Sequence, residues 1–335
     1  VQVRWIGRCK FPLVRLLSIL LLLLRHRPEI IQSVHFHTNL YTMLAARLLH
    51  VFEIGAIRND AYGEVRRLKR WGGLLLHSPR VLFANSAHGI KNAIDLGVPP
   101  ARLRLLPNAV DSSIFKPSRK KHDGSVHVVT IGRLAPQKRM DRFLAVFKRV
   151  TLQRSLQVDV KGTIVGSGPL REELLAYARE LRLFPRFVQL RESTDDILSV
   201  YRDADILVLT SDYEGTPNVV LEAMACGLPV VAFGIAAIRE IICHAETGII
   251  VEPGDISAMA NVIVSLANDK EWRESIGRQA RRYILKSRSL DVLEKNLSSY
   301  YGGIIAPPAI LPSPPQVVME KNVSVCHSLF GSQRG

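Results

Sequence analysis

Short apolar segments alternate with helical segments along the C-terminal half of this chain, and this alternation constrains the fold more than any other feature. The strand segments are continuous runs of Val, Ile and Leu. Strands of that kind, separated by helices, form parallel sheets that helices cover on both faces. We therefore predict an α/β fold with a doubly wound parallel sheet. The expected strands are Val126–Ile131, Val158–Val165, Phe187–Leu190, Ile206–Leu209, Pro229–Phe233 and Gly248–Val251, and the expected helices are Arg139–Val150, Pro169–Leu181, Asp195–Arg202, Pro217–Ala225, Ala236–Ile242, Ile256–Asn268 and Lys270–Tyr283.

The N-terminal part repeats this rhythm with fewer strands. A length of 335 residues is enough for two domains. We place their boundary near residue 122, in the polar segment 118–125, and expect strands at Ile30–Phe36, Phe52–Ile57, Val81–Ala84 and Arg102–Pro107 with helices at Phe11–Arg25, Leu40–Leu49, Glu64–Leu76 and Ala87–Asp95. The expected organisation is a first domain 1–122, a second domain 123–285, a helix 286–305 that returns to the first domain, and a Pro-rich tail 306–335 without order.

Residues 209–234 read as a strand, an acidic loop, a helix and a second strand. In an open α/β sheet, ligands bind at the carboxyl ends of the strands. We predict Thr216 as the N-cap of the helix and Pro217 as its first residue, so that the free N–H groups and the helix dipole there suit a phosphate. Glu222, about one and a half turns into the helix, would accept the two hydroxyls of a ribose. Glu214, before the helix, would meet a sugar attached to that phosphate.

The run Glu214-Gly215-Thr216-Pro217 and the run Glu222-Ala223-Met224-Ala225 together resemble the Glu-x7-Glu motif of the retaining glycosyltransferases of family 4. The segment Pro107-Asn108-Ala109-Val110-Asp111 resembles the interdomain stretch of that family, with Ala109 in place of a usual Gly. The resemblance covers roughly residues 25–300 and implies the GT-B fold, with two Rossmann-like doubly wound domains that face a cleft. The Gly-rich strand–loop unit that opens the family's first domain is not recognisable, so we expect this domain to be incomplete at its N-terminal start.

The resemblance also implies which residues bind the donor and act on it. The segment Gly132-Arg133-Leu134 with Lys138 resembles the family's phosphate clamp, in which an Arg fork and a Lys charge would offset the charge of the leaving diphosphate. Arg191 stands where the family usually has a Gly that contacts the nucleotide base. We expect Glu214, Arg133 and Lys138 at the catalytic centre, and Glu222, Gly215, Thr216, Pro217, Asn218, Ser211, Arg191 and Gly132 around the bound donor.

Candidates on the acceptor side come from the first domain. His35 and His37 alternate on a predicted strand and would therefore face one side, either in the cleft or in a structural role. Arg58 and Asn59 follow the next strand, where many family members have a His. No third ligand accompanies the two histidines, so we expect no metal site. We also expect no cofactor, the donor substrate being a UDP-, GDP- or ADP-sugar.

The positive charge of the chain is concentrated in its first part. Residues 1–122 carry 20 Lys and Arg against 6 Asp and Glu, whereas the remainder carries 25 against 24, within a total of +15. A basic half suggests an anionic partner. We favour an anionic membrane or a lipid-phosphate acceptor over nucleic acid, because no nucleic-acid-binding motif is present. The apolar run Leu16–Leu24 is too short to span a bilayer, so it forms either a core helix or a membrane-surface helix.

Four scattered cysteines without paired spacing suit a reducing cytoplasm. We therefore expect a cytoplasmic protein with peripheral contact to the inner face of the plasma membrane. The expected function is transfer of a sugar from a nucleotide-diphosphate sugar to a glycan or lipid-linked acceptor, with retention of anomeric configuration, in cell-envelope polysaccharide synthesis. The alternative is a nucleotide-binding fragment of such an enzyme without activity. A dehydrogenase is disfavoured, because Arg171 stands where the dinucleotide fingerprint beginning at Gly166 needs Gly.

Overall fold

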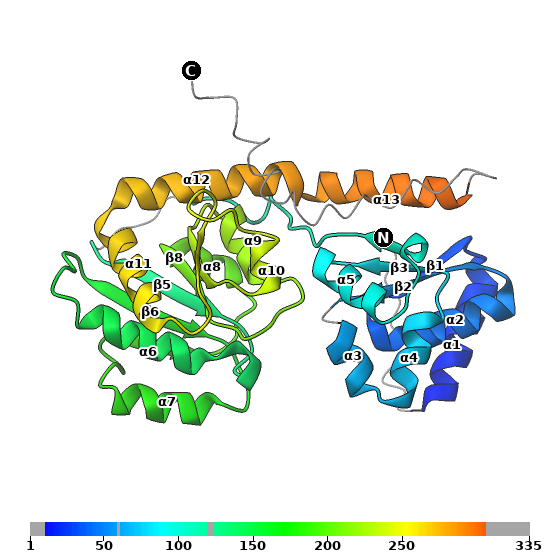
Figure 1. Ribbon diagram of the computed structural model, residues 1–335, viewed down its shortest axis with the longest axis horizontal. Coiled ribbons are helices and arrows are strands. Elements are labelled where there is room, and N and C mark those ends of the chain that lie inside the picture. Colours follow the sequence, from blue (N-terminus) through cyan, green and yellow to red (C-terminus); the bar gives the residue numbers. More distant parts are fainter. Residues whose placement is uncertain (1–10, 59–60, 119–123, 306–335) are drawn as a thin grey trace, which may run out of the picture. The chain divides into compact units, whose positions relative to one another are not determined.

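The computed structural model describes residues 11–58, 61–118 and 124–305, and these form two compact units. The first unit contains the chain up to Pro107 together with the stretch that begins at Asn296, and the second unit contains Asn108–Lys295. Each unit has its own parallel sheet with helices around it (Figure 1). The prediction of an α/β fold with two parallel-sheet units is confirmed.

The chain changes unit after Pro107 and not near residue 122. The reason is local: the N–H of Val110 donates to the Arg288 carbonyl at 2.9 Å, and the Val110 side chain is buried in the core of the second unit. The chain leaves the second unit within helix α13 (Leu290–Ile305). In the first unit, the hydroxyl of Tyr300 on this helix then donates to the Leu105 carbonyl at 3.1 Å.

The second unit contains a six-stranded sheet in which every pairing is parallel, with the order β10-β9-β8-β5-β6-β7. The direction of winding reverses between β5 and β8, which makes these neighbours the topological switch point of a doubly wound sheet. Loops that leave the carboxyl ends of β5 and β8 therefore diverge to the two faces and leave a crevice between them. The strands are β5 (Val126–Ile131), β6 (Val160–Val165), β7 (Val188–Arg191), β8 (Ile206–Leu209), β9 (Val230–Phe233) and β10 (Ile249–Val251).

Helices cover both faces of this sheet, and each face has its own hydrophobic core. Strand β5 shows how the two cores arise: Val128 packs into one and the next residue, Val129, packs into the other. Successive strand side chains point to opposite faces, so a continuous apolar strand feeds both cores. The helices are η3 (Pro136–Lys138), α6 (Met140–Thr151), α7 (Arg171–Glu180), α8 (Ile197–Asp203), α9 (Asn218–Ala225), α10 (Ala236–Arg239), α11 (Ile256–Asn268) and α12 (Lys270–Ser287).

The first unit contains a four-stranded parallel sheet in the order β1-β2-β3-β4. The buried side chain of Asn39 fixes one helix on it, because its Oδ1 accepts the Ala56 N–H at 2.9 Å. The elements are α1 (Pro12–His26), β1 (Ile30–Gln32), η1 (Phe36–Thr38), α2 (Asn39–Leu49), β2 (Phe52–Ile57), α3 (Ala61–Arg67), α4 (Arg70–His77), β3 (Val81–Ala84), α5 (Ala87–Asp95), η2 (Pro100–Arg102) and β4 (Leu103–Leu105).

Two predicted elements of this unit are wrong. The strand predicted to reach Phe36 ends at Gln32, and the chain turns into η1. The Thr38 hydroxyl donates to the His35 carbonyl at 2.6 Å, and the turn buries Phe36 in the core.

The helix predicted over 64–76 is two helices, α3 and α4, with Lys69 at a positive φ of 49° between them. A Cβ at Gly72 would overlap the backbone of Val65. This glycine therefore lets the two helices fold closely against each other.

Two further findings concern cysteines and membranes. Among the described residues, Cys226 has a free thiol. A cytoplasmic location stays a prediction, without support from the cysteines. Among the described helices, none combines the length and the apolarity that crossing a bilayer requires.

Candidate functional site

Glycine turns hold the loops after β5 and β6 together. The Gly132 N–H donates to the Val165 carbonyl at 3.0 Å, and the Leu134 N–H donates to the Ser167 carbonyl at 2.9 Å. A Cβ on Gly166 would overlap the Gly132 carbonyl oxygen, so the two backbones touch where no side chain fits. The backbone of the segment that starts at Gly132 is therefore fixed from one side.

A second set of contacts, which we call the Asp212 staple, joins the loop after β5 to the loop after β8. The Asp212 carboxylate forms ion pairs with Arg139 at 3.3 Å and with Arg142 at 2.5 Å. Gln137 adds two bonds: its carbonyl accepts the Asp212 N–H at 3.0 Å, and its side-chain amide donates to the Tyr213 carbonyl at 2.7 Å. The two loops that flank the switch point are thus tied to each other.

Within these tied loops, three predicted site residues meet. The Lys138 Nζ lies 2.6 Å from Oε1 of Glu214, and the Ser211 hydroxyl donates to the same oxygen at 2.7 Å. The side chains of Lys138 and Glu214 are only 17% and 9% exposed. A carboxylate and an ammonium held in a partly dry crevice interact more strongly than a surface pair. This Lys138–Glu214–Ser211 cluster is the charged centre of the switch point.

Helix α9 begins beside this cluster, at Asn218, one residue later than predicted. Pro217, not Thr216, is the N-cap, with φ −73° and ψ 104°, and no side chain caps the helix there. Asn218 accepts a hydrogen bond from the Asn108 side chain at 2.8 Å. The N–H groups of a first helical turn have no partner within the helix, and they carry its positive dipole end.

Glu222 lies further along α9 and is bound to Tyr201 of α8. The Tyr201 hydroxyl donates to Oε2 of Glu222 at 2.6 Å, and it is the one side-chain partner that Glu222 has in the described part of the chain. Burial raises the pKa of the Glu222 carboxyl, while the bond from Tyr201 acts in the opposite direction. Burial and the neighbouring carboxylate raise the pKa of Tyr201 well above its usual range, so this hydroxyl remains a donor. One carboxylate oxygen of Glu222 is thus engaged and oriented.

Two predicted donor-side arginines lie apart from the cluster. Arg133 is exposed, and within the described residues it makes no ion pair and no side-chain hydrogen bond. Arg191 ends β7, the outermost strand of the sheet, and its guanidinium donates to Gln189 at 3.3 Å. Its carbonyl accepts the Gly166 N–H at 3.0 Å, which ties it to the glycine turns.

The acceptor-side candidates belong to the first unit. His35 precedes η1 and His37 lies within it, so they do not share a strand face, but their rings still stack with centroids 5.5 Å apart. Partial burial, with the charge of His35, lowers the pKa of His37. Arg58 follows β2, and its Nε donates to the Val34 carbonyl at 3.3 Å. Asn59 lies outside the described residues.

Some residues of the site gave no clear signal in the sequence. The Asp212 staple depends on two loops that are far apart in the chain, and Tyr201 meets Glu222 across the core between two helices. Asn108 was part of a recognised segment but had no assigned role. In the structure, Arg139 of the staple sits in the left-handed region at φ 49°, which non-glycine residues adopt mainly where other contacts hold them.

Comparison with known proteins agrees with this architecture. The family model described as "Glycosyl transferases group 1" matches residues 111–283, which is more than half of the chain. The chain belongs to this glycosyltransferase family. A second model, described as "Glycosyltransferase Family 4", matches residues 1–114 of this glycosyltransferase. The two matches meet close to the point at which the chain changes unit.

Three curated relatives show the sequence similarity. The glycosyltransferase is 26% identical over 262 residues to N-acetyl-alpha-D-glucosaminyl L-malate synthase of Bacillus anthracis, covering 76% of this chain and 66% of that protein. It is 26% identical over 274 residues to UDP-Gal:alpha-D-GlcNAc-diphosphoundecaprenol alpha-1,3-galactosyltransferase of Escherichia coli, covering 76% and 70%. A third relative, sulfoquinovosyl transferase SQD2 of Arabidopsis thaliana, is matched over only 38% of its length. The chain thus spans part of each relative, less than two thirds of the first and third.

Solved structures confirm the fold. The structure of Anabaena HepE in complex with UDP and glucose matches with a TM-score of 0.77 and 18% identity, covering 86% of this chain and 81% of that one. The apo form of the lipopolysaccharide outer core galactosyltransferase WaaB matches with a TM-score of 0.69 and 18% identity, covering 89% and 83%. At such identities the likeness supports the GT-B fold and nothing finer.

Proposed function

We propose that this glycosyltransferase transfers a sugar from a nucleotide-diphosphate sugar to a glycan or lipid-linked acceptor, with retention of anomeric configuration. The Lys138–Glu214–Ser211 cluster carries the proposal, because it places a cation and a carboxylate at the switch point of the second sheet. In a ligand that carries a diphosphate and a sugar, the diphosphate can contact the Lys138 ammonium and the sugar can contact the Glu214 carboxylate. The names of the relatives, which include a UDP-Gal-dependent galactosyltransferase, support the donor class.

In the proposed complex, each part of the donor has its own partners. Glu222, with one oxygen held by Tyr201, offers the other to the ribose hydroxyls. Lys138, Arg133 and the first-turn N–H groups of α9 bind the diphosphate. Glu214 and the backbone from Gly215 to Asn218 position the donor sugar. Gly132 leaves room for the phosphates beside Lys138, and Ser211 orients Glu214.

The proposed reaction breaks the bond between the sugar C1 and the diphosphate oxygen and forms a bond from C1 to the acceptor oxygen on the same face. The acceptor proton passes to the leaving phosphate oxygen. Negative charge therefore grows on the diphosphate as the bond breaks, and Lys138 and Arg133 stabilise it. Incubation with UDP-, GDP- and ADP-sugars and a lipid-phosphate acceptor, followed by NMR of the product's anomeric proton, tests this proposal. An inverted product, or no transfer from any of these donors, would contradict it.

The second candidate is a protein of this fold that binds a nucleotide at the switch point but does not catalyse transfer. This alternative predicts nucleotide binding without transfer. The same incubation, combined with a binding measurement, separates the two functions.

We expect Asp212→Asn to weaken donor binding while it leaves stability nearly unchanged. The ion pairs of Asp212 are partly exposed, and pairs of that kind contribute about 0–1 kcal/mol to stability. They nevertheless hold Lys138 and Glu214 in register across two loops. The expected result is a donor dissociation constant raised about tenfold, or about 1.4 kcal/mol, with an unfolding midpoint close to that of the parent. Calorimetry with the donor nucleotide and a thermal melt measure both; unchanged binding would show that the staple has no positioning role.

We further propose that the first unit contacts an anionic membrane surface through α1. Leu13, Leu17 and Leu21 of α1 lie four residues apart and are 75%, 59% and 68% exposed. Arg25 continues this row at the next position and is also exposed. A row of exposed leucines that ends in an arginine matches an interfacial helix, in which apolar side chains enter the lipid and basic ones meet the headgroups.

Replacement of Leu17 and Leu21 by Glu is expected to reduce binding to vesicles that contain phosphatidylglycerol by at least tenfold. The substitutions remove apolar area and place two negative charges on the contact face. Co-sedimentation measures the effect, and Leu152→Glu, an equally exposed leucine of the second unit, serves as control. Equal binding of the parent, the double variant and Leu152→Glu would contradict the proposal. So would binding of the parent to uncharged vesicles as strong as its binding to vesicles with phosphatidylglycerol.

A further inference from the structure

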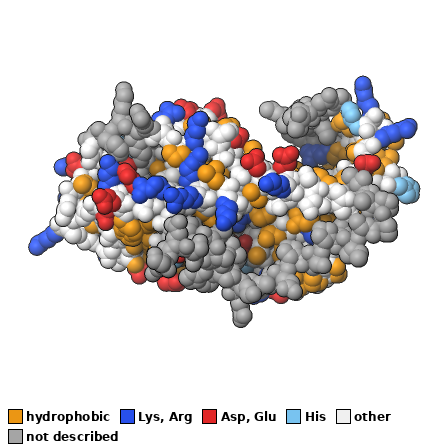
Figure 2. Space-filling view, turned by 90° about the horizontal axis from the view of Figure 1, so that it is seen from above, with side chains coloured by type: hydrophobic (Ala, Val, Ile, Leu, Met, Phe, Trp, Pro, Cys, Tyr) orange, Lys and Arg blue, Asp and Glu red, His pale blue; other side chains and the backbone are white. Residues whose placement is uncertain are grey.

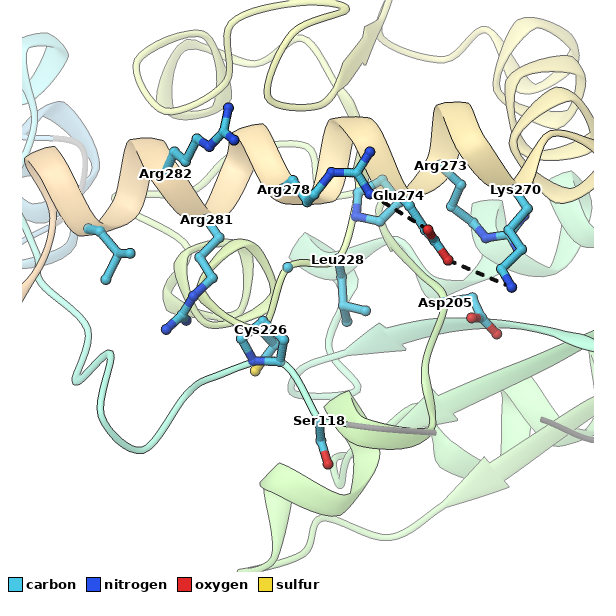
Figure 3. Close-up of a pocket in the computed structure, with 14 residues that line it drawn as sticks. Ser118, Asp205, Cys226, Leu228, Lys270, Arg273, Glu274, Arg278, Arg281 and Arg282 are labelled. Atoms are coloured by element: carbon cyan, nitrogen blue, oxygen red, sulfur yellow. Dashed lines mark ion pairs between the residues drawn. The ribbon is translucent and has the colours of Figure 1, made fainter. Parts of the chain in front are cut away.

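A cavity of about 720 Å³ lies in the second unit, at the amino ends of β8 and β9. One side of it is formed by α12, and the other by Asp205 before β8 and by the turn 226–229 before β9 (Figure 3). The Lys138–Glu214–Ser211 cluster follows the carboxyl ends of strands, so the cavity lies at the opposite edge of the same sheet. It is large enough for a small-molecule ligand.

Positive charge dominates the lining of this cavity. Five cations of α12 face it, against the two carboxylates of Asp205 and Glu274: they are Lys270, Arg273, Arg278, Arg281 and Arg282. The Asp205 carboxylate already accepts the His127 N–H at 2.9 Å. Glu274 is shared by Lys270 at 3.9 Å and Arg278 at 3.6 Å, distances too long for hydrogen bonds. On the face of the second unit that carries α12, Lys and Arg side chains gather in a row (Figure 2).

Two of these arginines are held rigidly with donors to spare. Arg273 is 8% exposed, and its Nη1 donates to the Leu266 and Ala267 carbonyls at the end of α11. Arg281 donates through its Nη1 to the carbonyls of Ala225 and Phe115. A guanidinium has five N–H donors. Within the described residues, neither Nε nor Nη2 of these two arginines has a partner.

The arrangement of the side chains fits an anion with a compact charged group. Arg281 extends toward Cys226, whereas Lys270 extends toward Asp205 (Figure 3). Leu228 lies between them at the floor of the cavity. A planar guanidinium can donate two parallel hydrogen bonds to two oxygens of one phosphate. A guanidinium that is already fixed loses little conformational entropy when it binds. The cavity therefore offers pre-positioned donors, an excess of three positive charges and an apolar floor.

We propose that this cavity is a second binding site, for a phosphate monoester or pyrophosphate group, separate from the donor site. The phosphate lies against Arg278 and Arg281, and Lys270, Arg273 and Arg282 add long-range attraction. The rest of the ligand contacts Leu228. The phosphate belongs either to a soluble metabolite or to a lipid headgroup, since both present the same anionic group. The site does not depend on the donor function of the other edge.

Calorimetry with inorganic pyrophosphate tests the site on the whole chain. We expect the double variant Arg278→Gln/Arg282→Gln to raise the dissociation constant of this site at least tenfold, since both side chains are exposed and their loss does not threaten folding. Lys138→Gln separates the two sites, because it weakens a donor-side diphosphate site but not this one. Arg154→Gln, an exposed arginine elsewhere in the second unit, is the control for loss of charge.

Three outcomes overturn the proposal: no pyrophosphate binding, binding unaffected by the double variant, and binding abolished by Lys138→Gln. Nucleotide binding is measured separately as a readout of the donor site. If the double variant still binds nucleotide, a loss of pyrophosphate binding reports on this cavity alone. Vesicles with phosphatidic acid identify the source of the phosphate. If the double variant loses binding to phosphatidic acid vesicles but keeps binding to phosphatidylglycerol vesicles, the ligand is a lipid headgroup that carries a phosphate monoester. If the double variant loses pyrophosphate binding but binds the vesicles as the parent does, the ligand is a soluble phosphate compound.

Discussion

Replacement of Lys138 by Gln is expected to lower kcat for sugar transfer by about 10²–10³-fold, the typical loss when one group that stabilises a developing negative charge is removed. Lys138 is 17% exposed and lies against Glu214 at 2.6 Å, so no water or nearby flexible cation replaces it easily. The effect falls on kcat more than on KM, because the charge on the diphosphate grows during bond breaking. Release of the nucleotide from the donor sugar, measured at saturating acceptor, reports the change.

Two controls belong to that measurement. Lys148→Gln, on α6 of the same unit, removes an equal charge away from the switch point and should leave kcat unchanged. The double variant Lys138→Gln/Glu214→Gln removes the ion pair as a whole, so it shows how much of the single effect comes from a carboxylate left without its cation. If kcat of Lys138→Gln lies within threefold of the parent value, Lys138 does not stabilise the charge that develops in the reaction.

The second large effect is expected from a single methyl group. Gly166→Ala places a Cβ on the Gly132 carbonyl oxygen, and the backbone must move because no flexible side chain is there to yield. We expect the free energy of unfolding of the second unit to fall by about 3 kcal/mol, the upper end for forced overpacking. Donor binding should weaken as well, because the displaced backbone leads into the segment that carries Lys138.

Gly254→Ala is the matched control for this substitution. Gly254 also has a positive φ, 86°, but nothing lies within 4 Å of a Cβ added there. Its cost is therefore backbone strain alone, about 1–2 kcal/mol, and it lies far along the chain from the glycine turns. Urea unfolding followed by circular dichroism compares the two variants. Equal losses of stability would show that the Gly132–Gly166 contact adds nothing beyond strain.

The bounds of strands in the second sheet could be predicted closely from the sequence. A strand that is buried on both faces has apolar residues at every position, so it appears as a continuous apolar run. Val126–Ile131 and Ile206–Leu209 have the predicted bounds. The false strand near His35 shows the limit of such patterns. The alternation His35-Phe36-His37 is typical of a strand, yet the Thr38 hydroxyl bond and the burial of Phe36 turn the chain there. Similarly, the break between α3 and α4 depends on a tertiary contact at Gly72 that no local pattern records.

The candidate site also has a part that the sequence predicts and a part that it does not. The family resemblance implied that Lys138, Ser211 and Glu214 all lie around the bound donor, and the structure brings them into contact. What holds them could not be predicted. The Asp212 staple and the bond from Tyr201 to Glu222 arise only when segments distant in sequence pack together. The one-residue shift in the start of α9 is within the ordinary uncertainty of helix boundaries.

Calorimetric titration with UDP, GDP and ADP, on this chain and on Glu222→Ala, tests most directly whether the switch point of the second sheet is a donor-nucleotide site. Glu180→Ala, an exposed glutamate on α7, is the control. We predict that one nucleotide binds and that Glu222→Ala weakens it at least tenfold, or about 1.4 kcal/mol, while Glu180→Ala does not. Binding of none of the three, or equal binding to the parent and to Glu222→Ala, would contradict the donor site.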